Sequence, residues 1–374
     1  MFFRNVIGQE GIKRRLIQSV HDERVSHALM FAGPSGTGKL AMAIAYAQFI
    51  SCSNRSATDS CGVCPSCHKY NKLAHPDLHF VFPIYNSAKV KNAVSDDFIT
   101  EWREKVLSNP YFSFSNWLDF IDAGNAQGMI YERESDVVYR KLNLKSFEAE
   151  YKTMIIWLPE KMNNQCANKL LKIIEEPPSK TLFILITEDE EAVIGTIRSR
   201  TQPVKFPFID DESMRNALQT LEGADPAQIG DAIRLAGGNF IKAREYVIPN
   251  EDEQFYFRKF QEMMRQAYKR EVLAQMEWAD EMAAIGRDKQ KAFFAFASRL
   301  VREYFMMNFN NSEMVYLSEE EKNWGKQFAP FINEQNVIQL YNEFETATKQ
   351  IAWNGQPRII FLDTALRMVR LIKK

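Results

Sequence analysis

The stretch FAGPSGTGKL, residues 31–40, places a glycine-rich loop between two apolar runs of different character. The run HALMFAG (27–33) predicts a buried strand, and LAMAIAYAQFI (40–50) predicts a helix. Strand, glycine loop and helix in this order form the setting of a phosphate-binding loop, in which backbone N–H groups and the helix N-terminus face the anion. The sequence therefore predicts an α/β domain with a nucleotide cradle.

The candidate nucleotide-binding residues follow the pattern G-x-x-x-x-G-K. They are Gly33, Pro34, Ser35, Gly36, Thr37, Gly38 and Lys39. The next residue should be Ser or Thr, whose hydroxyl helps to hold Mg²⁺, but it is Leu40. The loop is therefore expected to be an inherited nucleotide cradle, kept for its shape or for weak binding. Its expected ligand is ATP or ADP, bound without proper Mg²⁺ ligation. The alternative is a glycine turn that binds nothing.

A second requirement for hydrolysis also fails. The predicted strand MIIWL (154–158) should end in the acidic pair that holds Mg²⁺ and activates water, but Trp157 and Leu158 stand there. Glu160 is displaced along the chain and is a poor substitute, because side-chain direction reverses at each residue of a strand. No intrinsic ATPase activity is expected.

Further apolar runs predict the rest of a parallel sheet, because parallel strands are covered on both faces. They lie at 78–82 and 181–187, and the strands stop after QPVKFPF (202–208). Beyond that point the apolar residues recur with helical spacing. The predicted parts are an α/β domain at 1–207, a small helical lid domain at 208–249 and an all-helical collar domain at 250–374.

Composition limits the partners. The 374 residues carry a net charge of −1, so the whole chain is not expected to attract nucleic acid electrostatically. No window approaches the roughly 18 uninterrupted apolar residues of a membrane-spanning helix. A soluble cytoplasmic protein without a membrane partner is expected.

Four of the five cysteines lie within sixteen residues, with the spacing C-x8-C-x2-C-x2-C. They are Cys52, Cys61, Cys64 and Cys67. Tight C-x2-C pairs suit tetrahedral thiolate ligation of Zn²⁺, and no catalytic partner is evident, so a structural zinc module at 52–67 is predicted. His68 is an alternative ligand, and Cys166 is expected to be a small core residue.

Several segments occur in one order: VIGQE, HALMFAGPSGTGK, the four-cysteine module, HPDLH, ANKLLKIIEEPP and IRSRTQ. Together they resemble the clamp-loader branch of the AAA+ ATPases over residues 1–82 and 128–248, and NGQPRIIFLDTALRM resembles the family's collar helix. The resemblance implies an AAA+ P-loop domain in a five-subunit ring that opens a sliding clamp and places it on primed DNA. The implied partners are the other loader subunits, the sliding clamp and, through the assembled ring, primer–template DNA.

The resemblance also implies that each ATP site takes an arginine from the next subunit, within a Ser-Arg-Cys motif. That motif reads Ser199, Arg200, Thr201 here, and Arg198 is a competing candidate. Because Ser199 and Arg200 persist beside lost magnesium ligands, the chain is expected to complete a neighbour's site without running its own. The alternative is a surface arginine in an ion pair. Ile241 stands where ATPase members carry a nucleotide-sensing arginine.

Residues 83–127 match nothing in the family. They are rich in aromatic residues, but acidic side chains outnumber Lys89, Lys91, Arg103 and Lys105. Stacking on single-stranded nucleic acid is therefore disfavoured, and a small packed insertion that contacts a partner is expected.

Three functions compete. A non-hydrolysing scaffold subunit of a clamp loader fits Leu40, Trp157 and Leu158 beside an intact Arg200. An ATP-hydrolysing motor subunit of the same assembly would need Glu160 and another ligand to hold Mg²⁺. A stand-alone phosphate-loop kinase or NTPase leaves the helical last domain and the arginine motif unexplained.

Overall fold

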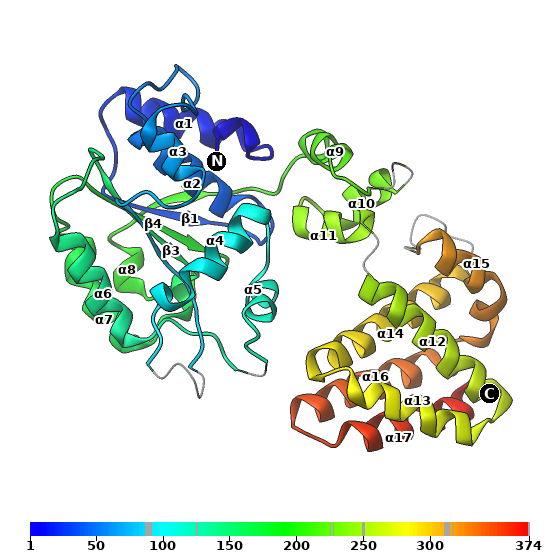
Figure 1. Ribbon diagram of the computed structural model, residues 1–374. Coiled ribbons are helices and arrows are strands. Elements are labelled where there is room, and N and C mark those ends of the chain that lie inside the picture. The colour runs from blue at the N-terminus through cyan, green and yellow to red at the C-terminus, as the bar shows by residue number, and fades with distance from the viewer. Residues whose placement is uncertain are drawn as a thin grey trace. The chain divides into compact units, whose positions relative to one another are not determined.

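The computed structural model describes residues 1–86, 92–124, 126–224, 226, 228–248, 251–309, 315 and 317–372. The chain divides into two compact units, Met1–Val247 and Ile248–Lys374, which are shown in Figure 1 and described separately below. Among the described residues, no helix combines the length and the apolar character needed to cross a membrane.

The first unit contains a five-stranded sheet in which all neighbouring strands are parallel. The strands are β1 (Ala28–Ala32), β2 (Leu78–Val81), β3 (Lys152–Trp157), β4 (Thr181–Thr187) and β5 (Gln202–Lys205). Their order in the sheet is β2-β3-β4-β1-β5. The four strands that precede β5 occupy the predicted apolar runs. Pro203, which has no N–H to donate, lies on the edge strand β5, where a lost ladder bond is tolerated.

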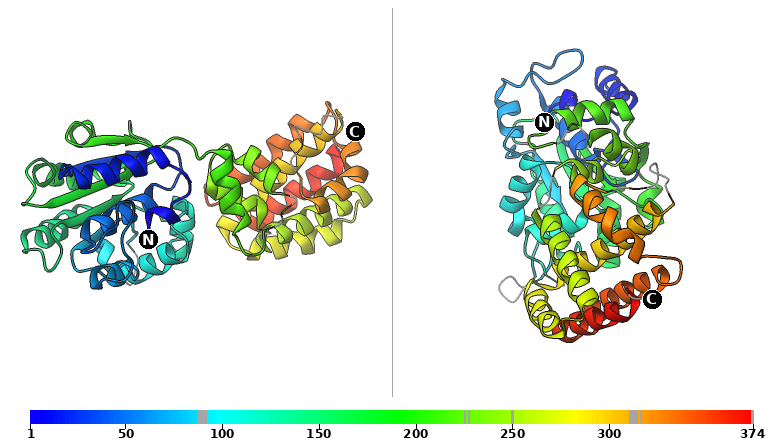
Figure 2. Two further views of the ribbon diagram at one scale, coloured as in Figure 1. Left: turned by 90° about the horizontal axis from the view of Figure 1, so that it is seen from above. Right: turned by 90° about the vertical axis from the view of Figure 1, so that its right-hand side faces the viewer.

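Helices cover both faces of this sheet (Figures 1 and 2). The helices α1 (Glu10–His21) and α2 (Lys39–Ser51) belong to one core, and α6 (Glu132–Asn143) and α7 (Asn164–Glu175) belong to the other. Successive residues of β3 alternate between these cores: Ile155 and Trp157 pack into the α2 core, while Met154 and Ile156 pack into the α7 core. This alternation decides that Trp157 is on the side of the phosphate loop.

Shorter elements complete the first unit. They are η1 (Phe3–Asn5), α3 (Pro65–Tyr70), η2 (Ser95–Phe98), α4 (Ile99–Ser108), α5 (Phe114–Phe120), η3 (Pro159–Lys161) and α8 (Gly195–Arg198), followed by α9 (Asp211–Gln219), α10 (Ile229–Ala236) and α11 (Phe240–Val247). We call α9, α10 and α11 the lid helices. Because they belong to the same compact unit as the sheet, the three-part division of the chain stays a prediction.

The second unit is helical throughout its described residues and has its own apolar core. Its elements are α12 (Glu251–Lys269), α13 (Val272–Ala284), α14 (Arg287–Met307), α15 (Glu319–Phe328), η5 (Ala329–Phe331), α16 (Val337–Ala352) and α17 (Pro357–Leu371). Aromatic rings join α14 to α17, since Phe294 stacks on Phe361 with ring centroids 4.6 Å apart. The predicted fold class, a parallel-sheet P-loop domain followed by small helices and a helical C-terminal part, is confirmed.

The insertion at 83–127 is packed into the first unit. Trp102 and Trp117 are fully buried, and Trp102 stacks on Phe82 at the end of β2, with ring centroids 4.1 Å apart. Its aromatic residues therefore build core, as the prediction of a packed insertion required. Lys89 and Lys91 lie outside the described residues.

A buried carboxyl group joins the insertion to α6 and makes stability depend on pH. Glu134 accepts a hydrogen bond at Oε2 from the Ser95 N–H (2.7 Å), and burial raises its pKa to about 7, although that hydrogen bond opposes the rise. A raised pKa means that the folded protein holds the proton more tightly than the unfolded chain. The stabilisation from this group is complete below the unfolded pKa of 4.5 and is lost as pH rises through about 7.

Replacing Glu134 by glutamine should therefore stabilise the protein at alkaline pH. We expect the free energy of unfolding of Glu134→Gln to exceed that of the wild type by up to about 3 kcal/mol near pH 8, and by far less near pH 5. Urea denaturation at the two pH values measures this. Glu132→Gln, which alters a half-exposed carboxylate on the same helix, is the control. Equal differences at both pH values would contradict the assignment.

Candidate nucleotide site and cysteine cluster

The glycine loop between β1 and α2 follows the path of a phosphate-binding loop. Gly36 and Gly38 have φ angles of 75° and 85°, which residues with a side chain rarely adopt. Gly38 is the N-cap of α2, which begins at Lys39. The local sequence thus places the N-terminus of a long buried helix at the end of the loop.

Lys39 is turned back onto the loop itself. Its Nζ donates hydrogen bonds to the carbonyl oxygens of Gly33 (2.6 Å) and Pro34 (2.5 Å). Burial lowers its pKa to about 8, an effect partly offset by the negative charges of Glu188 and Glu160. The ammonium group therefore satisfies carbonyl groups of the loop, where a bound nucleotide would offer phosphate oxygens.

The space in front of the loop is very small. It has a volume of about 30 Å³, room for one or two water molecules. The loop residues 36–40 line it together with Trp157, Ile186 and Glu188 of the sheet side, Ile241 of the lid helices, and Pro110, Tyr111 and Phe112 of the insertion. The loop, the insertion and the lid helices thus approach one another closely at this point.

The two expected acidic positions at the end of β3 are buried and apolar. Trp157 is 4% exposed and packs against Phe112, with ring centroids 5.2 Å apart, and Leu158 is 2% exposed. Glu160 accepts a hydrogen bond at Oε1 from the Glu188 N–H (3.1 Å), and burial raises its pKa. Glu188, which sequence reasoning missed, is the carboxylate that lines the small space.

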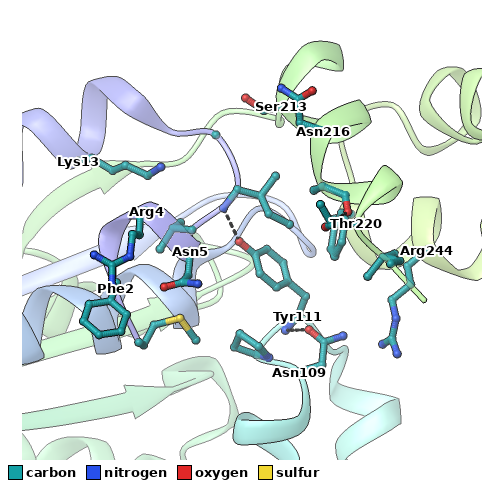
Figure 3. Close-up of a pocket in the computed structure, with 18 of the residues that line it drawn as sticks. Phe2, Arg4, Asn5, Lys13, Asn109, Tyr111, Ser213, Asn216, Thr220 and Arg244 are labelled. Carbon is teal, nitrogen blue, oxygen red and sulfur yellow. Dashed lines mark hydrogen bonds between the residues drawn. The ribbon is translucent and has the colours of Figure 1, made fainter. Parts of the chain in front are cut away.

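A second, larger cavity of about 820 Å³ lies between the N-terminal segment and the lid helices (Figure 3). Tyr111 forms part of its wall, and its Oη accepts a hydrogen bond from the Ile7 N–H (2.9 Å). Tyr111 also lines the 30 Å³ space. Its ring therefore contributes a wall to both spaces, a role that no local sequence signal indicated.

Ser199 and Arg200 lie between α8 and β5, with Ser199 exposed and about a third of the Arg200 side chain exposed. Arg200 Nε is 2.9 Å from Oε2 of Glu175, the last residue of α7, and Nη1 donates to the Thr196 carbonyl (3.0 Å). The competing Arg198 forms its own ion pair with Glu191 (2.5 Å). In the isolated chain Arg200 is therefore an arginine in an ion pair, which is the alternative that the sequence left open. Its insertion into the ATP site of a neighbouring subunit stays a prediction.

The four cysteines of residues 52–67 converge as their spacing predicted. All four sulfur atoms lie within 4.8 Å of one another, with Cys52 and Cys64 3.9 Å apart and Cys61 and Cys67 4.0 Å apart. Tetrahedral ligation at a Zn–S distance of about 2.3 Å requires sulfur atoms about 3.8 Å apart, so the cluster fits zinc. His68 is not needed, and Cys166 is buried in the α7 core, as expected.

We expect the purified protein to carry about one zinc ion per chain, measured by plasma mass spectrometry. Cys67→Ser should lose the metal and lower the melting temperature, because a metal that binds the folded site and not the unfolded chain contributes its binding free energy to folding. Cys166→Ser, which changes an equally buried cysteine outside the cluster, is the matched control. Full zinc content in Cys67→Ser would exclude the four-thiolate site.

The chain is similar in sequence to subunits of DNA polymerase III. The family model described as "DNA polymerase III, delta subunit" matches residues 8–210. The Bacillus subtilis (strain 168) DNA polymerase III subunit delta′ is 28% identical over 210 residues, which is 56% of this chain and 51% of the relative. Subunit tau of the same organism is 22% identical over 386 residues, or 96% of this chain and 60% of the relative.

Other relatives are longer still. The Mycobacterium tuberculosis (strain ATCC 25618 / H37Rv) DNA polymerase III subunit gamma/tau is 26% identical over 242 residues, covering 63% of this chain and 35% of the relative. The chain thus spans about a third to three fifths of the length of these relatives. Among solved structures, a gamma subunit-related protein of Thermotoga maritima aligns over 96% of this chain and 99% of its own, with 12% identity and a TM-score of 0.41.

Proposed function

The chain belongs to the DNA polymerase III delta subunit family, which groups it with clamp-loader proteins, and on this premise we propose that it is a non-hydrolysing, delta-prime-type subunit of the clamp loader. The observation that carries the proposal is the contrast within one domain. Leu40 and Trp157 replace magnesium ligands, whereas Ser199 and Arg200 remain at the surface, where a neighbouring subunit can reach them.

In this role the subunit helps to load the sliding clamp on primed DNA during replication in the cytoplasm. Its partners are the gamma/tau and delta subunits of a five-membered ring, the clamp and, through the ring, primer–template DNA. Arg200 is donated in trans to the ATP site of a neighbour, where an arginine stabilises charge on the transferring phosphoryl group. Zinc on the four cysteines has a structural role.

The second candidate is a motor subunit of the gamma/tau type, which several relatives represent. One observation favours it: Glu188 lines the space in front of the phosphate loop, and its N–H holds the Glu160 carboxylate nearby. A motor would need these carboxylates to hold Mg²⁺. The buried aromatic position of Trp157 and the 30 Å³ volume weigh against it.

Two measurements test the proposal together. The isolated chain should hydrolyse no ATP above background, and a reconstituted loader that lacks the chain should lose clamp loading on primed DNA. Clamp loading is followed by the fluorescence of a labelled clamp. If the isolated chain hydrolyses ATP and Lys39→Ala abolishes this activity, the chain is a motor subunit. If clamp loading is unaffected when the chain is omitted, the chain is not a subunit that the loader needs.

A further inference from the structure

We propose that residues 109–112 of the insertion act as a built-in substitute for nucleotide: they occupy the phosphate cradle, exclude ATP and hold the lid helices against the sheet. We call these residues, Asn109 to Phe112, the aromatic strap. The inference concerns the cradle of this chain alone, and it does not depend on membership of a clamp loader.

The first contact is between Tyr111 and the helix N-terminus that would receive a phosphate. A Cβ atom built on Gly38 would lie 2.9 Å from Tyr111 Oη and 3.2 Å from Cε1, so the phenol rests directly on the backbone of the loop. At the same time Tyr111 Oη accepts a hydrogen bond from the Ile7 N–H (Figure 3). The ring is 7% exposed and therefore fills the space between loop and chain start.

The strap has a defined shape of its own. The Tyr111 N–H donates to Oδ1 of Asn109 (3.0 Å), and Pro110 between them restricts the backbone further. On the other side Phe112 packs against Trp157 (5.2 Å) and Trp102 (5.7 Å). Trp157 stands at a position where an acidic magnesium ligand is expected. The residue that replaces this ligand therefore packs directly against the strap.

The lid helices contact both the glycine loop and Tyr111 of the strap. Phe240, the first residue of α11, donates its N–H to the Gly36 carbonyl (3.1 Å), and its ring lies 5.0 Å from that of Tyr111. A Cβ atom on Gly36 would come within 2.0 Å of Oδ1 of Asn239, whose side chain also caps α11 through the Ile241 N–H (3.0 Å). Loop, strap and lid thus contact one another directly.

Removal of the Tyr111 ring from the aromatic strap should therefore allow ATP to bind. We expect isothermal titration calorimetry to show saturable ATP binding by Tyr111→Ala that is at least about tenfold tighter than any binding by the wild-type chain. Adding Lys39→Ala to Tyr111→Ala should abolish the gained binding. Tyr111→Phe, which keeps the ring and loses the hydrogen bond to Ile7, should stay closed to ATP.

Hydrogen exchange of the same proteins reports on the lid. In Tyr111→Ala without ATP, amides of α11 should exchange at least about tenfold faster than in the wild type, and ATP should restore their protection. Saturable ATP binding by the wild type that Tyr111→Ala leaves unchanged would overturn the proposal. So would a folded Tyr111→Ala protein whose lid stays protected and whose cradle stays closed. If Tyr111→Ala does not fold, tight ATP binding by Tyr111→Phe and the wild type alike overturns it, and its absence from both supports it.

Discussion

In a loader reconstituted with clamp and primed DNA, Arg200→Ala should lower ATP hydrolysis at the neighbouring site by about 10³-fold or more, the usual loss when an arginine supplied in trans is removed. Lys39→Ala in this chain should leave that hydrolysis unchanged, because the chain's own cradle takes no part. The measurement is steady-state phosphate release with each variant assembled into the complete ring.

Arg198→Ala provides the matched control. Arg198 and Arg200 lie two residues apart, each about a third exposed and each paired with one glutamate. Release of Arg200 from Glu175 costs little, since exposed ion pairs contribute about 0–1 kcal/mol, so assembly can redirect it to a phosphate. Loss of ATP hydrolysis with Arg198→Ala but not with Arg200→Ala would show that Arg198, and not Arg200, is the arginine supplied to the neighbouring site. Loss with Lys39→Ala would indicate a working site in this chain.

Restoring the missing acid should damage the fold instead of restoring hydrolysis. Trp157→Asp would place a carboxylate among the rings of Trp102, Phe112 and Phe114, which surround the indole at centroid distances of 5.3, 5.2 and 6.4 Å. It removes a large buried side chain and buries a charge without a partner. We expect the free energy of unfolding to fall by on the order of 5 kcal/mol.

Urea denaturation measures this change, and Trp157→Phe, which retains an aromatic ring, should lose much less. Leu40→Thr is a second control because it restores the other missing magnesium ligand with a smaller, uncharged side chain. A Trp157→Asp protein as stable as the wild type, with ATP hydrolysis that depends on Lys39, would show that the aromatic cluster is dispensable and the site recoverable.

Local signals predicted most of the scaffold correctly. The strands β1 to β4 lie on near-continuous apolar runs, since a parallel strand buried on both faces needs no contact information to be recognised. The cysteine module was equally accessible, because C-x2-C spacing brings sulfur atoms together within a turn. The ordered motifs also pointed to the family that the comparison with known proteins shows.

The state of the phosphate loop was not accessible in this way. By its own residues the loop reads as an open cradle, and positive φ angles at Gly36 and Gly38 agree with that reading. Its closure depends on Tyr111, which meets Ile7 across 104 positions of the chain, and on Phe240 of α11. The sequence of the insertion indicated only that its aromatic residues would be packed.

The amino-acid sequence alone determined the parallel-sheet domain, the loop with its missing hydroxyl, the zinc-binding spacing and the helical C-terminal part, because each depends on neighbours a few residues apart. Only the tertiary structure decided which side chain faces the loop, that Lys39 bonds the carbonyl groups of Gly33 and Pro34, and that a space of about 30 Å³ lies between the loop, the insertion and the lid helices. Those properties arise from contacts between segments distant in sequence, which folding alone brings together.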